Sequence, residues 1–115
     1  MSEKDFGAYL YDVIRAIEKI KKFTAGQDFY AFSSDAKTFD SVVLNIQIIG
    51  EALKKVPLKI LEPYKSINWK DIKGMRDIIV HDYNEIDPEI VWKVVNDKLD
   101  DLAKVVTQIQ KDTGK

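Results

Sequence analysis

The middle of the chain holds a long, largely apolar stretch, Phe39-Asp40-Ser41-Val42-Val43-Leu44-Asn45-Ile46-Gln47-Ile48-Ile49-Gly50-Glu51-Ala52-Leu53-Lys54-Lys55-Val56. Its main apolar stripe has the spacing of an amphipathic helix, and its members are Phe39, Val42, Val43, Ile46, Ile49, Leu53 and Val56. At about 100° per residue, Leu44 and Ile48 fall on roughly the opposite side. The stretch therefore predicts a helix that is apolar on two faces, capped by a polar residue at 33–35 and stopped by Pro57.

A second long helix is predicted upstream of this stretch. Ser2-Glu3-Lys4-Asp5 fits a capping box at its start. Its apolar positions follow helical spacing, and Ala25-Gly26 closes it. Residues 27–34 predict an irregular or weakly helical link between the two long helices.

Downstream, residues 58–64 predict a short helical turn bounded by prolines. A fourth helix opens on a capping box at Asn68-Trp69-Lys70-Asp71 and is expected to run to about Tyr83. Asp87-Pro88 supplies a cap followed by proline at the first helical position. The apolar spacing from there to Ile109 predicts one continuous last helix, on the order of 35 Å long.

Long helices joined by short links predict an all-α fold, an antiparallel bundle of four to five helices. A chain of 115 residues is long enough for one core but not for two, so we expect a single domain over residues 1–115. No convincing strand alternation appears in the sequence.

Composition excludes several classes of function. The net charge of −1 counts against a protein that coats long stretches of nucleic acid, although it leaves room for a locally basic cleavage site. With no cysteine and one histidine, the chain offers neither a thiolate nucleophile nor a cysteine or histidine-rich metal site. The charged N-terminus lacks the apolar segment of a signal peptide. No run of apolar residues approaches the roughly 20 needed to span a bilayer, so a cytoplasmic protein is expected.

One charged residue is out of place in the fourth predicted helix. Arg76 and Tyr83 fall within the apolar stripe that starts at Trp69. A guanidinium in such a stripe is costly unless it is paired or faces a cleft. A buried salt bridge, with Asp71, Asp77 or Glu51 as partner, is one interpretation.

The single histidine raises a second question, because His81 lies about 140° from Arg76 around an ideal helix. The two converge only if the helix loosens before Asn84 or if a second copy completes a site. Alternatively, His81 interacts with the helix dipole near a C-terminus.

The stretch Gly74-Met75-Arg76-Asp77-Ile78-Ile79-Val80-His81-Asp82-Tyr83 carries the pattern R-x4-H-x-Y. It resembles the signature of the HepT-like HEPN toxins that are paired with a minimal nucleotidyltransferase antitoxin. Ile49-Gly50-Glu51-Ala52-Leu53-Lys54-Lys55, Ile67-Asn68-Trp69 and Asp87-Pro88-Glu89-Ile90-Val91-Trp92 resemble other segments of that family. The resemblance thus covers nearly the whole chain.

This resemblance implies a HEPN-like bundle that dimerises, with two motif helices meeting across a cleft. It also implies metal-independent endoribonuclease chemistry without a cofactor. As a hypothesis, His81 then acts as the general base on a ribose 2′-hydroxyl and Arg76 binds the phosphate. Asp77 is expected in a supporting role, against the alternative of an exposed helix carboxylate. Lys70 and Lys73 guide RNA or are simply solvated, and Tyr64 is expected to pack rather than stack on a base.

The resemblance gives Tyr83 a separate role as the residue to which the antitoxin, an MntA-like nucleotidyltransferase, transfers AMP. The predicted function is therefore the toxin of a type VII toxin–antitoxin pair, with RNA, the antitoxin and a second copy as partners and no membrane. The alternative is a non-catalytic helical subunit that binds substrate for a nucleotidyltransferase. A purely structural bundle would leave Arg76, His81 and Tyr83 without a common purpose.

Overall fold

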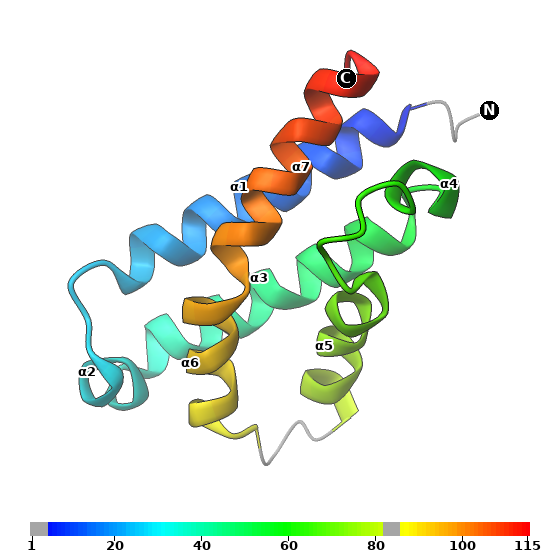
Figure 1. The fold of residues 1–115 in the computed structure, drawn as a ribbon. Coiled ribbons are helices and arrows are strands. Elements are labelled where there is room, and N and C mark those ends of the chain that lie inside the picture. Colours follow the sequence, from blue (N-terminus) through cyan, green and yellow to red (C-terminus); the bar gives the residue numbers. More distant parts are fainter. Residues whose placement is uncertain (1–4, 82–85) are drawn as a thin grey trace.

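The computed structural model describes residues 5–81 and 86–115, with side chains described outside residues 76–85. In these ranges the chain forms helices and no strand, which confirms the all-α prediction (Figure 1). The helices are α1 (Phe6–Thr24), α2 (Phe29–Ser34), α3 (Ala36–Lys54), α4 (Leu58–Leu61), α5 (Trp69–His81), α6 (Pro88–Asp97) and α7 (Leu99–Thr113). None of the helices in this part of the chain is both long and apolar enough to cross a membrane.

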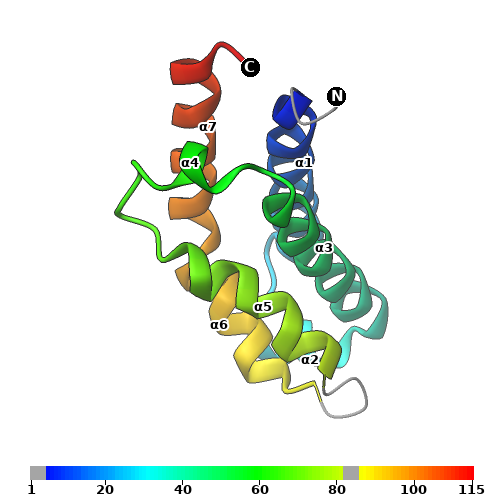
Figure 2. The same cartoon turned by 90° about the vertical axis from the view of Figure 1, so that its right-hand side faces the viewer.

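The central apolar stretch of the sequence becomes α3, which contacts α1, α2 and α5. α1 and α3 run antiparallel and side by side, and α7 packs along α1 (Figures 1 and 2). α6 contacts α7 and α2, so the last two helices of the chain pack against α2 and α1. The antiparallel arrangement predicted from the short links is therefore present.

One hydrophobic core joins these helices. Each of α1, α3 and α7 contributes four Val, Leu or Ile side chains that are at most 2% exposed. They are Leu10, Val13, Ile17 and Ile20 from α1, Val42, Ile46, Ile49 and Leu53 from α3, and Leu99, Leu102, Val106 and Ile109 from α7. Burying one such side chain contributes about 1.5–3 kcal/mol relative to leaving it exposed. This core fixes the three long helices relative to one another.

The predicted boundaries of α1 and α3 are largely confirmed. Asp35 is the N-cap of α3, and its carboxylate accepts hydrogen bonds from the Thr38 backbone N–H at 3.1 Å and the Thr38 hydroxyl at 2.7 Å. Gly26 has φ +77°, a left-handed conformation that favours glycine where α1 closes. The residues between them form the short helix α2, capped by Asp28. The expected weakly helical link is thus a helix of six residues.

At the start of α1, the predicted capping box at residues 2–5 lies mostly outside the described residues. Phe6 begins the helix, and Asp5 occupies the N-cap position without a side-chain hydrogen bond to the backbone. The cap predicted for the last helical region is present, since Asp87 Oδ1 accepts a hydrogen bond from the Glu89 N–H at 2.9 Å and Pro88 follows it.

The prediction of one continuous last helix is wrong, because the helix breaks at Lys98 into α6 and α7. In an unbroken helix Lys98 would fall in the buried stripe, four positions after Val94 and four before Leu102. In the structure Lys98 is exposed, while Val94 and Leu102 are buried. The break thus keeps an ammonium group in solvent, where its charge costs least. It also lets α6 pack against α2 while α7 packs against α1.

The cap of α3 yields a pH-dependent prediction. Hydrogen bonds from Thr38 hold the pKa of Asp35 below its ordinary value. A lowered folded-state pKa adds stability above the unfolded-state pKa, about 4 for aspartate, and this stability is lost as the pH falls through the folded-state pKa. We expect Asp35→Ala to lower Tm at neutral pH and the gap to wild type to narrow at about pH 3, as measured by thermal unfolding.

Asp35→Asn is the matched control, because its amide oxygen still accepts from the Thr38 N–H but carries no charge. Its Tm at neutral pH should lie between those of wild type and Asp35→Ala. A gap between wild type and Asp35→Ala that widens on acidification would contradict the assignment of Asp35 as a charged cap.

Candidate active site

Three of the four predicted site residues, Arg76, Asp77 and His81, lie on α5, whose backbone is helical from Trp69 to His81. Their side chains lie outside the described residues, and so does all of Tyr83. The structure therefore places the first three by their position on the helix.

The sequence before α5 explains why a helix begins there. Asn68 Oδ1 accepts a hydrogen bond from the Asp71 N–H at 3.1 Å, which confirms the predicted cap. The Ile72 N–H donates to the Asn68 carbonyl at 3.1 Å and closes the first helical turn. Asp71 also places a negative charge in that turn, where the helix dipole favours it.

The buried face of α5 is defined by Trp69, Ile72 and Met75, which are 8%, 4% and 6% exposed. α5 packs against α3. At about 100° per residue, position 76 falls between those of Trp69 and Ile72 around the helix axis. On a regular helix, position 76 therefore has the same angular register as this stripe, as the spacing predicted. A cation at such a position needs a polar partner or an open cleft.

Position 81 lies on a different side of α5. Because the backbone stays helical through His81, positions 76 and 81 remain about 140° apart around the axis. Loosening of the helix before Asn84 was one way in which the two residues could meet; the backbone is helical as far as His81, and residues 82–85 lie outside the described part of the chain. A second copy of the chain is the other way that the sequence left open.

The start of α5 is tied to the C-terminal helix through Tyr64. The Trp69 indole N–H donates to the Tyr64 carbonyl at 3.1 Å, and the Tyr64 hydroxyl donates to Asp112 Oδ2 at 2.6 Å. This hydrogen bond raises the pKa of Tyr64 and lowers the pKa of Asp112. Tyr64 is half-buried against the core. The expectation that it packs rather than stacks on a base agrees with these contacts.

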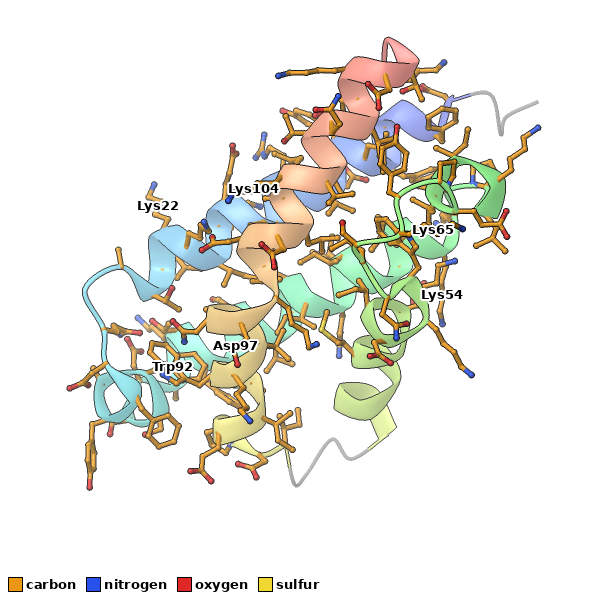
Figure 3. The ribbon with its side chains drawn as sticks, viewed as in Figure 1. Lys22, Lys54, Lys65, Trp92, Asp97 and Lys104 are labelled. Atoms are coloured by element: carbon orange, nitrogen blue, oxygen red, sulfur yellow. The ribbon has the colours of Figure 1, made fainter. Side chains whose placement is uncertain are left out.

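A hollow beside the start of α5 is acidic. It measures about 210 Å³ and is lined by Asp71, Asp97 and Asp101, with Lys98 as the cation in its lining. These carboxylates disfavour a polyanion in that hollow. Figure 3 shows Lys54, at the end of α3, and Lys65, in the link before α5.

Within the part of the chain that the structure describes, no group of three or more His, Asp and Glu side chains is placed to hold a metal ion. The sequence did not single out Tyr11 of α1, whose side chain is 53% exposed. The sequence signal for this exposure is that Tyr11 lies outside the buried stripe formed by Leu10, Val13 and Ile17.

Comparison with known proteins places these observations in a family. The sequence model of the family "Ribonuclease HepT-like" matches residues 13–109, a range that includes α5 and all four predicted site residues. "Putative RNase MJ0127" of Methanocaldococcus jannaschii is 35% identical over 97% of this chain and 93% of its own length. "Probable ribonuclease HepT" of Thermococcus cleftensis is 34% identical over 96% and 97%, respectively. No solved structure matches the chain.

The family match and the near-complete coverage of both relatives agree with the all-α bundle. The chain belongs to the HepT-like ribonuclease family.

Proposed function

We propose that this protein is the toxin of a type VII toxin–antitoxin pair and cleaves RNA with Arg76 and His81. The observation that carries the proposal is an arginine on α5 whose helical spacing aligns it with the buried residues Trp69, Ile72 and Met75, five positions before the only histidine of the chain. The family match spans both residues. The relatives' names as ribonucleases point to the reaction class.

The proposed chemistry is transfer of a phosphodiester to a neighbouring hydroxyl. His81, whose ordinary pKa is about 6.5, removes the proton from a ribose 2′-hydroxyl. The 2′-oxygen then attacks the adjacent phosphorus, the bond to the 5′-oxygen breaks, and that oxygen takes up a proton from water. Arg76 binds the non-bridging oxygens and stabilises the charge that develops on them. The products are a 2′,3′-cyclic phosphate and a free 5′-hydroxyl.

The site is proposed to form between two copies of the chain. On a regular α5, positions 76 and 81 lie on different sides of one helix, so a single copy does not direct both at one phosphate. Two α5 helices that face each other across a two-fold axis present both residue types to one cleft. Asp77, next to Arg76, takes a supporting role there by orienting the guanidinium.

The first prediction concerns cleavage. We expect Arg76→Ala and His81→Ala each to reduce RNA cleavage by at least about a hundredfold, since each removes transition-state stabilisation or proton transfer. Cleavage is measured on a labelled RNA, with Tm and circular dichroism to show that the fold is intact. Activity should persist in EDTA, and a 2′-deoxy nucleotide at the scissile position should block it.

Folded Arg76→Ala and His81→Ala variants that both cleave RNA like wild type would contradict the nuclease proposal. That result would leave the non-catalytic subunit of a nucleotidyltransferase as the better description. Products with a 5′-phosphate would contradict the cyclic-phosphate mechanism while leaving nuclease activity in place.

We further propose that Tyr83 is the off-switch of this activity. An MntA-like nucleotidyltransferase antitoxin would transfer AMP from ATP: the tyrosine oxygen bonds to the α-phosphorus and pyrophosphate leaves. Tyr83 follows Arg76 by seven positions, so two helical turns separate them if α5 continues. The added phosphate would compete with RNA for the guanidinium, and the nucleotide would fill the cleft.

The second prediction follows from this switch. Incubation with the antitoxin and ATP should add AMP to wild type at Tyr83, detected by mass spectrometry, and should stop RNA cleavage. The Tyr83→Phe variant should remain unmodified at that position and stay active in the same mixture. Tyr64→Phe is the matched control and should be modified and inhibited like wild type. Inhibition of Tyr83→Phe to the same extent would show that AMP on Tyr83 is not the switch.

A further inference from the structure

Three side-chain hydrogen bonds connect α7 to the start of α5. Gln108 Nε2 donates to Asp112 Oδ1 at 2.8 Å within α7. The Tyr64 hydroxyl donates to Asp112 Oδ2 at 2.6 Å, and the Trp69 indole N–H donates to the Tyr64 carbonyl at 3.1 Å. The link between α4 and α5, which contains Tyr64, passes beside α7 (Figure 2). We call these three hydrogen bonds the α7–α5 tie.

The place of Asp112 in the sequence is one that helix electrostatics disfavour. α7 ends at Thr113, so the Asp112 carboxylate lies in its last turn. The negative end of the helix dipole disfavours an anion there and favours a cation such as Lys111. Both carboxylate oxygens of Asp112 nevertheless accept hydrogen bonds, one of them from a residue 48 positions away. The contact with Tyr64, and not the stability of α7 itself, therefore accounts for an aspartate at this position.

α5 depends on the tie because α3 is the one helix, within the described part of the chain, against which it packs extensively. Apolar packing is non-directional. A hydrogen bond is directional, because its donor and acceptor must align. The α7–α5 tie therefore adds an angular constraint at Trp69, the first residue of α5.

The constraint at Trp69 carries along the helix to Arg76. The two positions are seven residues apart on one helical backbone, which leaves them about 20° apart around the axis and roughly 10 Å apart along it. A rotation or slide of α5 that moves Trp69 therefore moves position 76 by a comparable amount. Misplacing a group in an active site by about 1 Å can cost about a hundredfold in rate.

We propose that Asp112 is a positioning residue for the proposed ribonuclease site, acting through Tyr64 and Trp69 on the direction in which α5 presents Arg76. The inference rests on the proposed function, which supplies the role of Arg76. The α7–α5 tie holds the rotation of α5, so that the guanidinium meets the phosphate in the geometry of the transition state. Asp112 contacts neither RNA nor Arg76 in this proposal.

Cleavage kinetics of Asp112 variants test the proposal. Asp112→Ala removes the acceptor of the Tyr64 hydroxyl. We expect kcat and kcat/KM for a labelled RNA to fall equally, by about tenfold, since a contact made in the transition state is weakened while RNA binding is retained. Asp112→Asn keeps an oxygen that can accept from the Tyr64 hydroxyl, so its kcat should stay within about threefold of wild type.

Asp100→Ala is the matched control. The Asp100 carboxylate pairs with Lys21 Nζ, so its loss also removes a polar contact of α7, but that contact leads to α1 and not to the segment before α5. Asp100→Ala should leave kcat at the wild-type value. Equal kcat values for Asp100→Ala and Asp112→Ala, or a raised KM at unchanged kcat for Asp112→Ala, would overturn the proposal.

Tyr64→Phe tests whether Asp112 acts through Tyr64. This variant keeps the packed ring and removes only the hydroxyl, so its kcat should fall by the same factor as that of Asp112→Ala. The double variant should show no further loss, because both changes break one contact. AMP transfer to Tyr83 does not require the tie, so Tyr64→Phe is still modified and inhibited. Losses that multiply in the double variant would show that the two residues act independently and would refute the proposal.

Indole hydrogen exchange follows the tie without RNA. The chain has two tryptophans, so NMR can compare the indole N–H of Trp69 with that of Trp92. Asp112→Ala should speed exchange at Trp69 by about tenfold and leave Trp92 unchanged, and Asp100→Ala should change neither. Unchanged exchange at Trp69 would overturn the inference even if the protein cleaves RNA. If exchange responds as expected but wild type does not cleave RNA, the proposed function is wrong, and the tie is structural only.

Discussion

The packing of α3 between α1 and α5 is the constraint on which the rest of the structure depends. Val42, Ile46, Ile49 and Leu53 have no exposed surface, and they fix α3 in the core. On a neighbouring side α3 packs against α5, the helix that carries Arg76 and His81. On its outer side it exposes Leu44 and Ile48. One helix therefore links the core and the candidate active site.

The candidate site gains its local order from the segment that precedes it. Asn68 caps α5, and the Trp69 indole ties it to the link through the Tyr64 carbonyl. Tyr64 in turn holds Asp112 of α7. These polar contacts and the apolar face of α5 both precede Arg76 in the chain. Together they determine which side of α5 faces the core. Helical spacing then puts the position of Arg76 in line with that buried face.

Local chemistry made much of the fold predictable from the sequence. Side-chain caps such as Asp35 and Asp87, and the left-handed turn at Gly26, depend on a few adjacent residues. The two-faced character of α3 followed from spacing alone. The break at Lys98 could not be predicted in this way, because it depends on α6 and α7 packing against different helices, α2 and α1. The spacing of five between the buried Val94 and Leu99 was the signal available in the sequence.

The site was predictable only in part. Spacing placed Arg76 in the buried stripe of α5, and the family resemblance supplied its role. How Arg76 and His81 reach one phosphate depends on contacts between chains, which the periodicity of one chain does not contain. The backbone is helical as far as His81, so up to that residue the two positions stay on different sides of one helix, and a second copy is the route that the proposed function takes.

The most direct test of this account is the activity of a mixed dimer. Wild-type chains are paired with Arg76→Ala/His81→Ala chains, and the heterodimer is isolated by two different tags before RNA cleavage is measured. If one cleft needs residues from both copies, the heterodimer should cleave at less than about a tenth of the wild-type rate, a loss of more than 1.4 kcal/mol in transition-state stabilisation. A heterodimer with half the wild-type rate would show that each chain carries a complete site and would contradict the account.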